Sequence, residues 1–198
     1  MYKVFGMSES GNCYKVKLLL HQLGIEYEWE ELNILEGETR TPRFLSLNPN
    51  GKVPTLRIDS DQYLAESNAI LCYLSDGTPY WNSDPFHRAK TLEWAFFEQY
   101  SHEPYIAVAR FICKFLPADH PRQAELPRLH EGGYKALGVM EQQLTHTPFF
   151  VGDRYSIADI ALFAYTHIAA DGGFDLAGFP KIRAWMERVQ AQSGFIGM

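Results

Sequence analysis

The chain has 198 residues, of which 46% are hydrophobic and 21% charged, and its formal net charge at pH 7 is −6. This composition excludes a disordered chain, because disordered chains lack the apolar residues that build a core. The mild acidity argues against a nucleic-acid binder, which needs a basic patch. No stretch approaches the ~20 consecutive apolar residues of a membrane span, so we expect neither nucleic acid nor a membrane as a partner.

Targeting and thiol signals both favour a cytoplasmic protein. Residues 1–9 contain no basic segment followed by an apolar run, so we expect no secretory signal. The three cysteines, Cys13, Cys72 and Cys113, form no CxxC pair and no framework spacing. A small, uneven number of cysteines is typical of cytosolic proteins, whose thiols stay reduced. No spacing of His and Cys indicates a metal site.

The first 76 residues mix strand-like and helix-like patterns. Four apolar residues spaced i, i+3, i+4 and i+7 from Val16 predict a helix, and Gly24 is typical of a helix end. Residues 27–30 alternate with period two, as a strand does. The predicted elements in chain order are a strand at 2–5, a helix at 12–23, a strand at 27–30, a short helix at 43–47, hairpin strands at 53–58 and 62–64, and a helix that begins at Ser67.

Residues 77–84 contain clustered Gly, Pro and Asn and are the predicted linker between a domain at 1–76 and a domain at 85–198. Strand signals vanish after it. Asp84 followed by Pro85 is typical of an N-cap and a first helical position. The predicted helices are one from 85 to about 116 with a kink at Pro104, one between 120 and 144, and two that begin at Ser156 and Pro180. The sequence thus predicts an α/β unit followed by an all-helical unit.

Three local motifs stand out. Residues 48–54 read Asn-Pro-Asn-Gly-Lys-Val-Pro, which on its own indicates a loop followed by an edge strand, where a proline loses no ladder bond. Residues 66–70 read Glu-Ser-Asn-Ala-Ile, typical of a helix start capped by Ser67, whose free N–H groups also attract anions. Residues 155–160 read Tyr-Ser-Ile-Ala-Asp-Ile and predict a capping box, in which Ser156 caps a helix and Asp159 reaches back.

Together, these motifs and the order of the two units resemble the cytosolic glutathione transferase family over essentially the whole chain. The resemblance implies the α+β fold class, with an N-terminal thioredoxin-like βαβαββα domain followed by an all-α domain. It also implies a glutathione S-transferase of the cytoplasm that acts in detoxification and forms a homodimer.

The resemblance implies a glutathione site built from the first two motifs. The Val53–Pro54 bond is expected to be cis, which would turn the Val53 N–H and C=O toward the cysteinyl part of glutathione. Lys52 would meet the glycyl carboxylate. Ser67 would hold the γ-glutamyl carboxylate through its hydroxyl and N–H groups at the positive end of a helix, and Glu66 would hold the γ-glutamyl ammonium.

The segment 8–16, between the first strand and the first helix, should carry the chemistry. In serine-using branches of the family, the thiol-activating residue lies six positions before the aliphatic residue of the first helical turn, and counting back from Val16 gives Ser10. Asn12 matches the Asn that some bacterial relatives use two residues after the Ser or Thr. No Tyr stands at the position used by tyrosine-type members. Both Ser10 and Asn12 also fit a simple capping role.

Cys13 leaves a second mechanism open. A cysteine in a first helical turn can have a lowered pKa, and cysteine-type members of the family make mixed disulfides with glutathione. In those members the Cys aligns with Ser10 and not with Cys13. We therefore expect Cys13 to pack against the sheet.

The implied reaction is attack by the thiolate of glutathione on a small electrophile, with Ser10 and Asn12 donating hydrogen bonds to the sulfur. Glutathione is the expected co-substrate, and no metal or other cofactor is expected. Two alternatives stay open. One is a glutathione-dependent disulfide-bond reductase or peroxidase that uses the same site. The other is a non-enzymatic module that keeps the fold for protein partners.

Overall fold

Four short strands form one sheet in the computed structural model, which describes residues 1–198. Strand β1 (Tyr2–Gly6) pairs in parallel with β2 (Tyr27–Glu31) and antiparallel with β3 (Thr55–Arg57), and β3 pairs antiparallel with β4 (Tyr63–Ala65). The strand order is β2-β1-β3-β4, so β3 is an interior strand. The edge-strand interpretation of the 48–54 motif is therefore wrong. Pro54 is tolerated because it precedes the first paired residue of β3.

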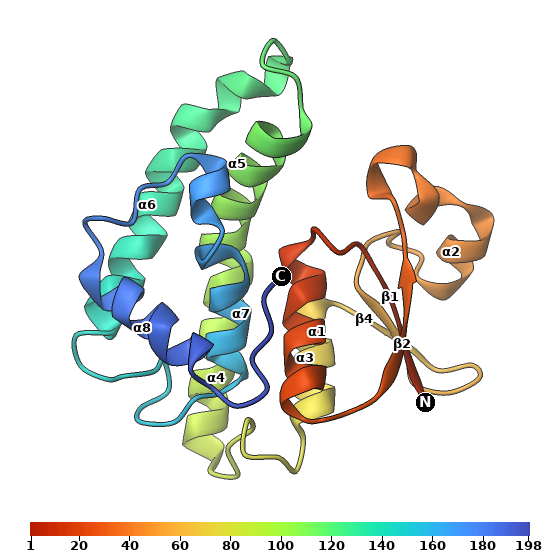
Figure 1. The fold of residues 1–198 in the computed structure, drawn as a ribbon, viewed down its shortest axis with the longest axis horizontal. Coiled ribbons are helices and arrows are strands. Elements are labelled where there is room, and N and C mark those ends of the chain that lie inside the picture. The colour runs from red at the N-terminus through yellow and green to blue at the C-terminus, as the bar shows by residue number, and fades with distance from the viewer. The chain divides into compact units, whose positions relative to one another are not determined.

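Helices cover both faces of this sheet. Helices α1 (Gly11–Gln22) and α3 (Ser67–Ser75) pack against each other on one face, and the short α2 (Pro42–Leu47) lies on the other (Figure 1). Two 3-10 turns, Ile34–Glu36 and Glu38–Arg40, lead into α2. The apolar spacing that predicts α1 is confirmed, since Val16, Leu19 and Leu20 are fully buried. Helix α1 ends before Gly24, whose φ of 64° suits glycine.

The chain folds into two compact units, one of Met1–Thr78 with Ser193–Met198 and one of Pro79–Gln192. The division between the units falls inside the predicted linker, but the last six residues belong to the first unit and not to the helices. Two contacts account for this. The Tyr14 hydroxyl donates to the Ile196 carbonyl at 2.6 Å, and Gly194 lies so close to α1 that a Cβ there would stand 2.8 Å from the Cα of Gln22.

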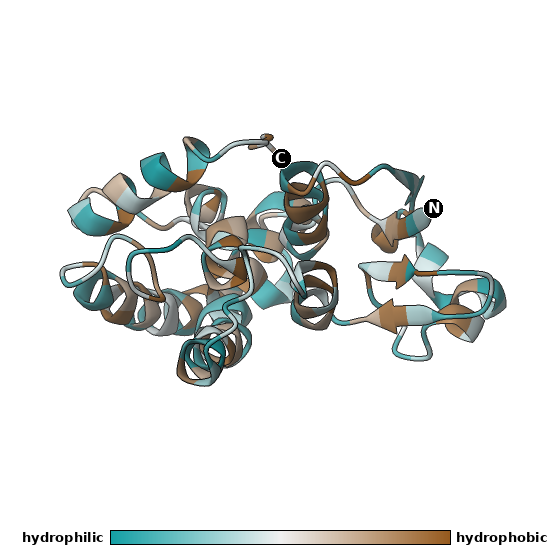
Figure 2. Ribbon diagram, turned by 90° about the horizontal axis from the view of Figure 1, so that it is seen from below, coloured by the Kyte–Doolittle hydropathy of each residue, from teal (hydrophilic) through white to brown (hydrophobic).

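The second unit is helical throughout. Its helices are α4 (Pro85–Phe97), α5 (Glu103–Phe115), α6 (Leu126–Gln143), α7 (Ile157–Thr166) and α8 (Pro180–Gln190), with 3-10 turns at Pro121–Glu125 and Ala169–Gly172. A π-helical turn, Glu98–His102, joins α4 to α5, and Pro104, where the sequence predicts a kink, is the second residue of α5. Every residue of α7 is buried, whereas several other helices show hydrophobic and hydrophilic residues side by side (Figure 2).

The predicted capping box begins α7. The Ser156 hydroxyl accepts the N–H of Ala158 at 3.3 Å, and Asp159 accepts the Ser156 N–H at 2.9 Å. Asp159 also accepts the Phe150 N–H at 3.1 Å and the Trp185 indole N–H at 2.9 Å. Burial raises the pKa of Asp159 to about 6, although these hydrogen bonds oppose the rise. The carboxylate thus joins three segments of the helical unit.

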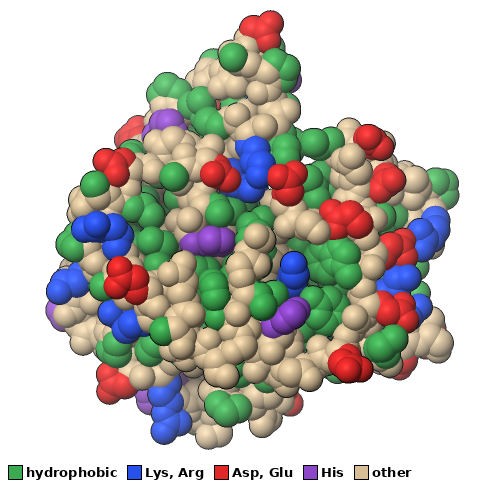
Figure 3. All heavy atoms as spheres, in the orientation of Figure 1, with side chains coloured by type: hydrophobic (Ala, Val, Ile, Leu, Met, Phe, Trp, Pro, Cys, Tyr) green, Lys and Arg blue, Asp and Glu red, His purple; other side chains and the backbone are tan.

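Three further observations concern the surface charges, the helices and the side chains that could bind a metal. Acidic and basic side chains are interspersed on the face seen in Figure 3. None of the helices combines the length and the apolar content that crossing a membrane requires, and no three His, Cys, Asp or Glu side chains are grouped to hold a metal ion.

Candidate functional site

The loop between β1 and α1 places Ser10 at the start of a helix. Ser10 is the N-cap of α1, and its hydroxyl oxygen accepts the Cys13 N–H at 3.4 Å. The Ser10 N–H donates to the Met7 carbonyl at 3.0 Å, which closes a tight turn. Capping uses a lone pair of the hydroxyl oxygen, so the same group can cap α1 and donate a hydrogen bond to a thiolate. The positive end of the helix dipole favours an anion at this point.

A hydrogen bond joins two of the predicted site residues, Asn12 at the start of α1 and Ser67 at the start of α3. The Ser67 hydroxyl donates to Asn12 Oδ1 at 3.2 Å and accepts from Lys15 Nζ at 3.3 Å. The hydroxyl proton of Ser67 is therefore engaged by Asn12. The backbone N–H of Ser67 is at the first position of α3, where an N–H has no acceptor within the helix. This N–H, and not the hydroxyl, is therefore the donor that Ser67 can offer to a carboxylate. Asn12 accepts through Oδ1, so its Nδ2 group is the part that can donate to a thiolate.

Lys15 joins this pair, although the sequence motifs did not single it out. Its side chain is fully buried, and a buried ammonium group needs polar partners, which Ser67 supplies. Lys15 follows Asn12 by three residues in α1, a spacing that puts both side chains on one face of the helix. This three-residue spacing was the signal in the sequence that could have placed Lys15 beside Asn12. The Lys15 charge adds to the positive potential at the start of α3.

Glu66 is the only non-glycine residue with a positive φ, 66°. Such a conformation costs on the order of 1–3 kcal/mol and is often found at functional sites. Glu66 is the N-cap of α3 but makes no capping hydrogen bond with its side chain. The alternative in which Ser67 caps α3 is therefore wrong, because Ser67 is its first helical residue. The exposed Glu66 carboxylate projects from a fixed backbone position.

The Val53–Pro54 peptide bond is cis, as the family resemblance implies. The Val53 side chain packs against the buried cluster of Phe5, Leu32 and Phe44. Its main-chain N–H and C=O are therefore the groups that Val53 can offer to a ligand. Whether glutathione pairs with them stays a prediction.

The loop before Val53, which the sequence motif indicates, is held by the side chain of Asn48. Asn48 Nδ2 donates to the Lys52 carbonyl at 2.8 Å and to the Thr55 hydroxyl at 3.2 Å, and its Oδ1 accepts the Asn50 N–H at 3.1 Å. Gly51 has φ 62°, and a Cβ there would stand 3.0 Å from the Thr39 carbonyl oxygen. These contacts fix the backbone of Lys52, whose side chain is exposed.

Cys13 is a buried side chain, as expected. Its Sγ accepts the Met7 N–H at 3.4 Å, and a Cβ on Gly6 of β1 would lie 3.2 Å from it. Burial raises the pKa of the thiol to about 11, with hydrogen bonds from Ser10 and Met7 lowering it only in part. At neutral pH the Cys13 side chain is therefore a thiol and a poor nucleophile.

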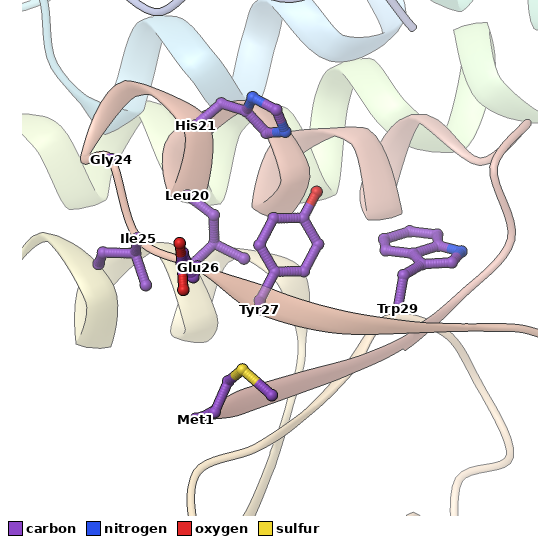
Figure 4. A pocket seen from close by; sticks show the side chains of 8 residues that line it. All are labelled: Met1, Leu20, His21, Gly24, Ile25, Glu26, Tyr27 and Trp29. Carbon is purple, nitrogen blue, oxygen red and sulfur yellow. The ribbon is translucent and has the colours of Figure 1, made fainter.

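An open pocket of about 600 Å³ lies elsewhere in the first unit. Figure 4 shows its lining, which is Met1, Leu20, His21, Gly24, Ile25, Glu26, Tyr27 and Trp29. None of the predicted site residues is among them. The candidate site is defined by its hydrogen bonds and helix starts, and not by this pocket.

Comparison with known proteins decides the family. The family model for the glutathione S-transferase N-terminal domain matches residues 9–76, and the family model for the C-terminal domain matches residues 94–193. The chain belongs to the glutathione S-transferase family. The thioredoxin-like domain followed by an all-α domain is thereby confirmed as the fold class.

Three relatives of this glutathione S-transferase family member are informative. A crystal structure of a glutathione S-transferase from Pseudomonas fluorescens is 56% identical, covers 99% of this chain and 98% of its own, and has a TM-score of 0.96. A glutathione transferase family member from the same species, with two glutathione bound, is 26% identical, covers 98% of this chain and 89% of its own, and has a TM-score of 0.85. The disulfide-bond oxidoreductase YfcG of Escherichia coli is 28% identical over 91% of this chain and 86% of its own.

Proposed function

We propose that this glutathione S-transferase family member ionises the thiol of glutathione for attack on a small electrophile. The observation that carries the proposal is the hydrogen bond between Ser67 and Asn12. This contact brings the starts of α1 and α3 together, and both helix starts attract negative charge. Neither helix has an acidic residue in its first turn to compete with an anionic ligand.

The five predicted residues Lys52, Val53, Pro54, Glu66 and Ser67 would form the glutathione site, and Lys15 adds a positive charge beside it. The γ-glutamyl carboxylate binds the Ser67 N–H beside the Lys15 charge, and the γ-glutamyl ammonium binds Glu66. The cysteinyl part pairs with the main chain of Val53, ahead of Pro54, as one strand pairs with another. Lys52 meets the glycyl carboxylate.

The sulfur of glutathione then lies at the start of α1. The Ser10 hydroxyl and the Asn12 amide donate hydrogen bonds that favour the thiolate over the thiol. Lowering the pKa of a thiol from about 8.5 to about 6.5 takes about 2.7 kcal/mol, which two hydrogen bonds to a charged group can supply. The thiolate forms a C–S bond to the electrophile, whose leaving group departs with its electron pair. Glutathione is the co-substrate, no resident cofactor takes part, and removing electrophiles in this way is detoxification chemistry.

The test is glutathione binding followed by turnover. We expect the protein to bind immobilised glutathione, to show the ultraviolet absorbance of a bound thiolate at neutral pH, and to conjugate a chloronitrobenzene. Ser60→Ala, in the exposed turn between β3 and β4, is the control that should change none of these. Failure to bind glutathione would overturn the proposal and favour a non-enzymatic interaction module.

A disulfide-bond reductase is the second candidate. It is supported by the similarity to YfcG and by the relative with two glutathione bound. In this reaction one glutathione thiolate attacks a disulfide and displaces a thiolate, and a second glutathione resolves the mixed disulfide. The products are the reduced substrate and oxidised glutathione. Faster turnover of a disulfide than of any chloronitrobenzene would favour this candidate.

We further propose a homodimer that uses an aromatic surface of the helical unit. Phe96 is 66% exposed and Tyr100, one turn later, is 86% exposed. Large exposed aromatic side chains at neighbouring positions typically mark an interaction surface. Light scattering should give twice the mass of one chain, and Phe96→Glu should give a monomer.

We also propose a cytoplasmic location. All three cysteines are free, with no disulfide between them, as is usual for proteins of a reducing compartment. Cell fractionation tests this location directly.

A further inference from the structure

We propose that Glu31 is a positioning residue, whose carboxylate fixes the loop that carries Ser10 and thereby sets how strongly Ser10 favours the thiolate of bound glutathione. The catalytic half of this inference rests on the proposed function. The contact between Glu31 and the loop does not.

Glu31 binds the loop through both carboxylate oxygens. Oε1 accepts the Ser8 backbone N–H at 2.8 Å, and Oε2 accepts the Ser8 hydroxyl at 2.7 Å. Oε2 also accepts the indole N–H of Trp29 at 2.6 Å. Hydrogen bonds to an ionised carboxylate are short and about twice as strong as neutral ones. Burial raises the pKa of Glu31, but the bonds from Ser8 and Trp29 and the charge of Lys17 outweigh it, so the pKa lies below its ordinary value.

The fold puts Glu31 at this place. In the parallel pairing of β1 with β2, Glu31 lies opposite Gly6, the last residue of β1. The loop leaves the sheet directly after Gly6, so the last residue of β2 lies next to the start of the loop. Glu31 is therefore an anchor from a neighbouring strand for the start of the loop.

Fixing Ser8 fixes Ser10 because both belong to one turn. The Ser10 N–H donates to the Met7 carbonyl, so Ser8 and Glu9 are the two central residues of a four-residue turn that Ser10 completes. Ser8 and Glu9 are exposed, so they gain little from packing. Holding the N–H and the hydroxyl of Ser8 on one carboxylate restricts the rotation of the turn. The turn sets the backbone position of Ser10, from which its hydroxyl oxygen reaches the Cys13 N–H.

Trp29 makes the anchor rigid. Its indole lies so close to Gly6 that a Cβ there would stand 2.6 Å from Cη2 and 2.8 Å from Cζ2. Figure 4 shows the Trp29 ring rising from β2 toward α1. The indole has few alternative rotamers in this space, and its N–H holds Oε2 of Glu31 in place. Glycine at position 6 is what allows this arrangement.

The expected size of the effect follows from the indirect role. Exposed hydrogen bonds and ion pairs contribute little singly, but here three donors converge on one carboxylate. A direct donor to an anion is typically worth about 10²–10³ in rate. A residue that only orients the donor should be worth less, about three- to tenfold in turnover.

The test compares Glu31→Ala with the matched control Glu28→Ala. Glu28 lies on the same strand and is also exposed, but its carboxylate stands 3.9 Å from Lys3 Nζ and Arg57 Nη2, on the sheet and away from the loop. Amide hydrogen exchange of the free protein measures the anchor alone. We expect the Ser8 amide to exchange about tenfold faster in Glu31→Ala, since it loses a charged acceptor, and to be unchanged in Glu28→Ala. Equal exchange in both variants would overturn the anchor.

Titration of bound glutathione measures the consequence. In Glu31→Ala the pKa of the bound thiol should rise and kcat should fall about three- to tenfold, while KM for glutathione changes by less than about twofold. Glu31→Gln, which keeps one acceptor oxygen, should restore part of the loss. A purely structural role would instead change KM or the melting temperature and leave the thiol pKa unchanged, and that result would overturn the inference.

The two proposals fail in different ways. If the wild-type protein binds no glutathione, the proposed function fails, and so does the catalytic half of this inference. The exchange of the Ser8 amide still decides whether Glu31 holds the loop. If the wild type forms a glutathione thiolate and Glu31→Ala forms it equally well, only the role of Glu31 is overturned.

Discussion

Two helices in this molecule have a serine as their N-cap, α1 and α7, and the residues at the third helical position (N3) of these helices differ. Ser156 caps α7, and the residue at N3 is Asp159, whose carboxylate closes the capping box. Ser10 caps α1, and the residue at N3 is Cys13, which brings no charge. The start of α7 is buried, and the Asp159 carboxylate of its own first turn compensates the positive end of the helix dipole. Ser10, in contrast, is half-buried, and α1 has no acidic residue in its first turn.

The difference separates a structural helix start from one that can take a ligand. A carboxylate at N3 satisfies the free N–H groups and neutralises the positive end of the dipole. The same carboxylate at the start of α1 would repel a glutathione thiolate. A helix that is to stabilise an anion must therefore leave this position uncharged, and α1 does so with Cys13. The following predictions test this contrast.

Removing the carboxylate from α7 should have the largest effect. Asp159→Ala leaves the N–H groups of Phe150, Ser156 and Trp185 without their acceptor. Each buried unsatisfied donor costs about 1–3 kcal/mol, so the free energy of unfolding should fall by about 3–5 kcal/mol. Urea denaturation measures this, with the exposed Asp153→Ala as the control. A loss below about 1 kcal/mol would contradict the role of Asp159.

The same carboxyl group should make stability depend on pH. The pKa of Asp159 is about 6 in the folded protein against an ordinary value of 3.8, so the folded state binds this proton more tightly. This tighter binding of the proton adds to the free energy of unfolding. The added stability is fully present below about pH 4 and is lost as the pH rises through about 6. Between pH 4 and 7 the unfolding free energy of the wild type should fall relative to Asp159→Asn by about 2–3 kcal/mol. An equal difference at both pH values would contradict the raised pKa.

Exchanging the two caps for alanine should separate chemistry from stability. Ser10→Ala removes the proposed donor to the sulfur, so turnover should fall about 10²-fold or somewhat less, since a thiolate is a diffuse anion. The pKa of the bound thiol should rise, and the loss of turnover should shrink as the pH increases. Steady-state kinetics across a pH series measures both.

Ser156→Ala is the matched control for Ser10→Ala. It should lower the free energy of unfolding by about 1–2 kcal/mol, as loss of an N-cap does, and leave the thiol pKa of bound glutathione as in the wild type. If both variants lose turnover equally, Ser10 is only a cap and the contrast between the two helix starts is wrong.

The elements and the capping box could be predicted from local sequence because their causes are local. The spacing of apolar residues around Val16, the turn residues before Val53 and the Ser-x-x-Asp pattern at Ser156 each act within a few positions. The motifs also sufficed to indicate the family, the enzyme class and the cis bond at Pro54.

The connections within the candidate site could not be predicted in this way. Lys15 and Ser67 are 52 positions apart, and Ser8 and Glu31 are 23 apart. Both contacts depend on strand register and helix packing, which no short pattern contains. The positive φ of Glu66 was equally hidden, because only tertiary contacts hold a non-glycine residue in that conformation.

Substitutions at the start of α3 should affect binding more than chemistry. Ser67→Ala and Glu66→Ala act on the γ-glutamyl end of glutathione, away from the sulfur. We expect KM for glutathione to rise about tenfold and kcat to change little, because uniform binding is lost. Kinetics at varied glutathione measures the split, with Ser60→Ala as the control. A collapse of kcat at constant KM would instead place Ser67 at the sulfur, through its bond to Asn12.

Cys13→Ser should have the smallest effect on turnover, although Cys13 stands at the position that distinguishes the two helix starts. With a pKa of about 11, only about one Cys13 side chain in 10⁴ is a thiolate at pH 7. The serine hydroxyl can still accept the Met7 N–H that Sγ accepts now. Turnover should therefore stay within about threefold of the wild type, with a loss of stability near 1 kcal/mol for the buried hydroxyl. Kinetics, and mass spectrometry after treatment with oxidised glutathione, measure the two outcomes. An inactive Cys13→Ser, with glutathione attached to Cys13 in the wild type, would replace the Ser10 mechanism with a mixed-disulfide one. In that case the uncharged N3 position of α1 would serve the cysteine thiolate itself, and not the thiolate of a bound ligand.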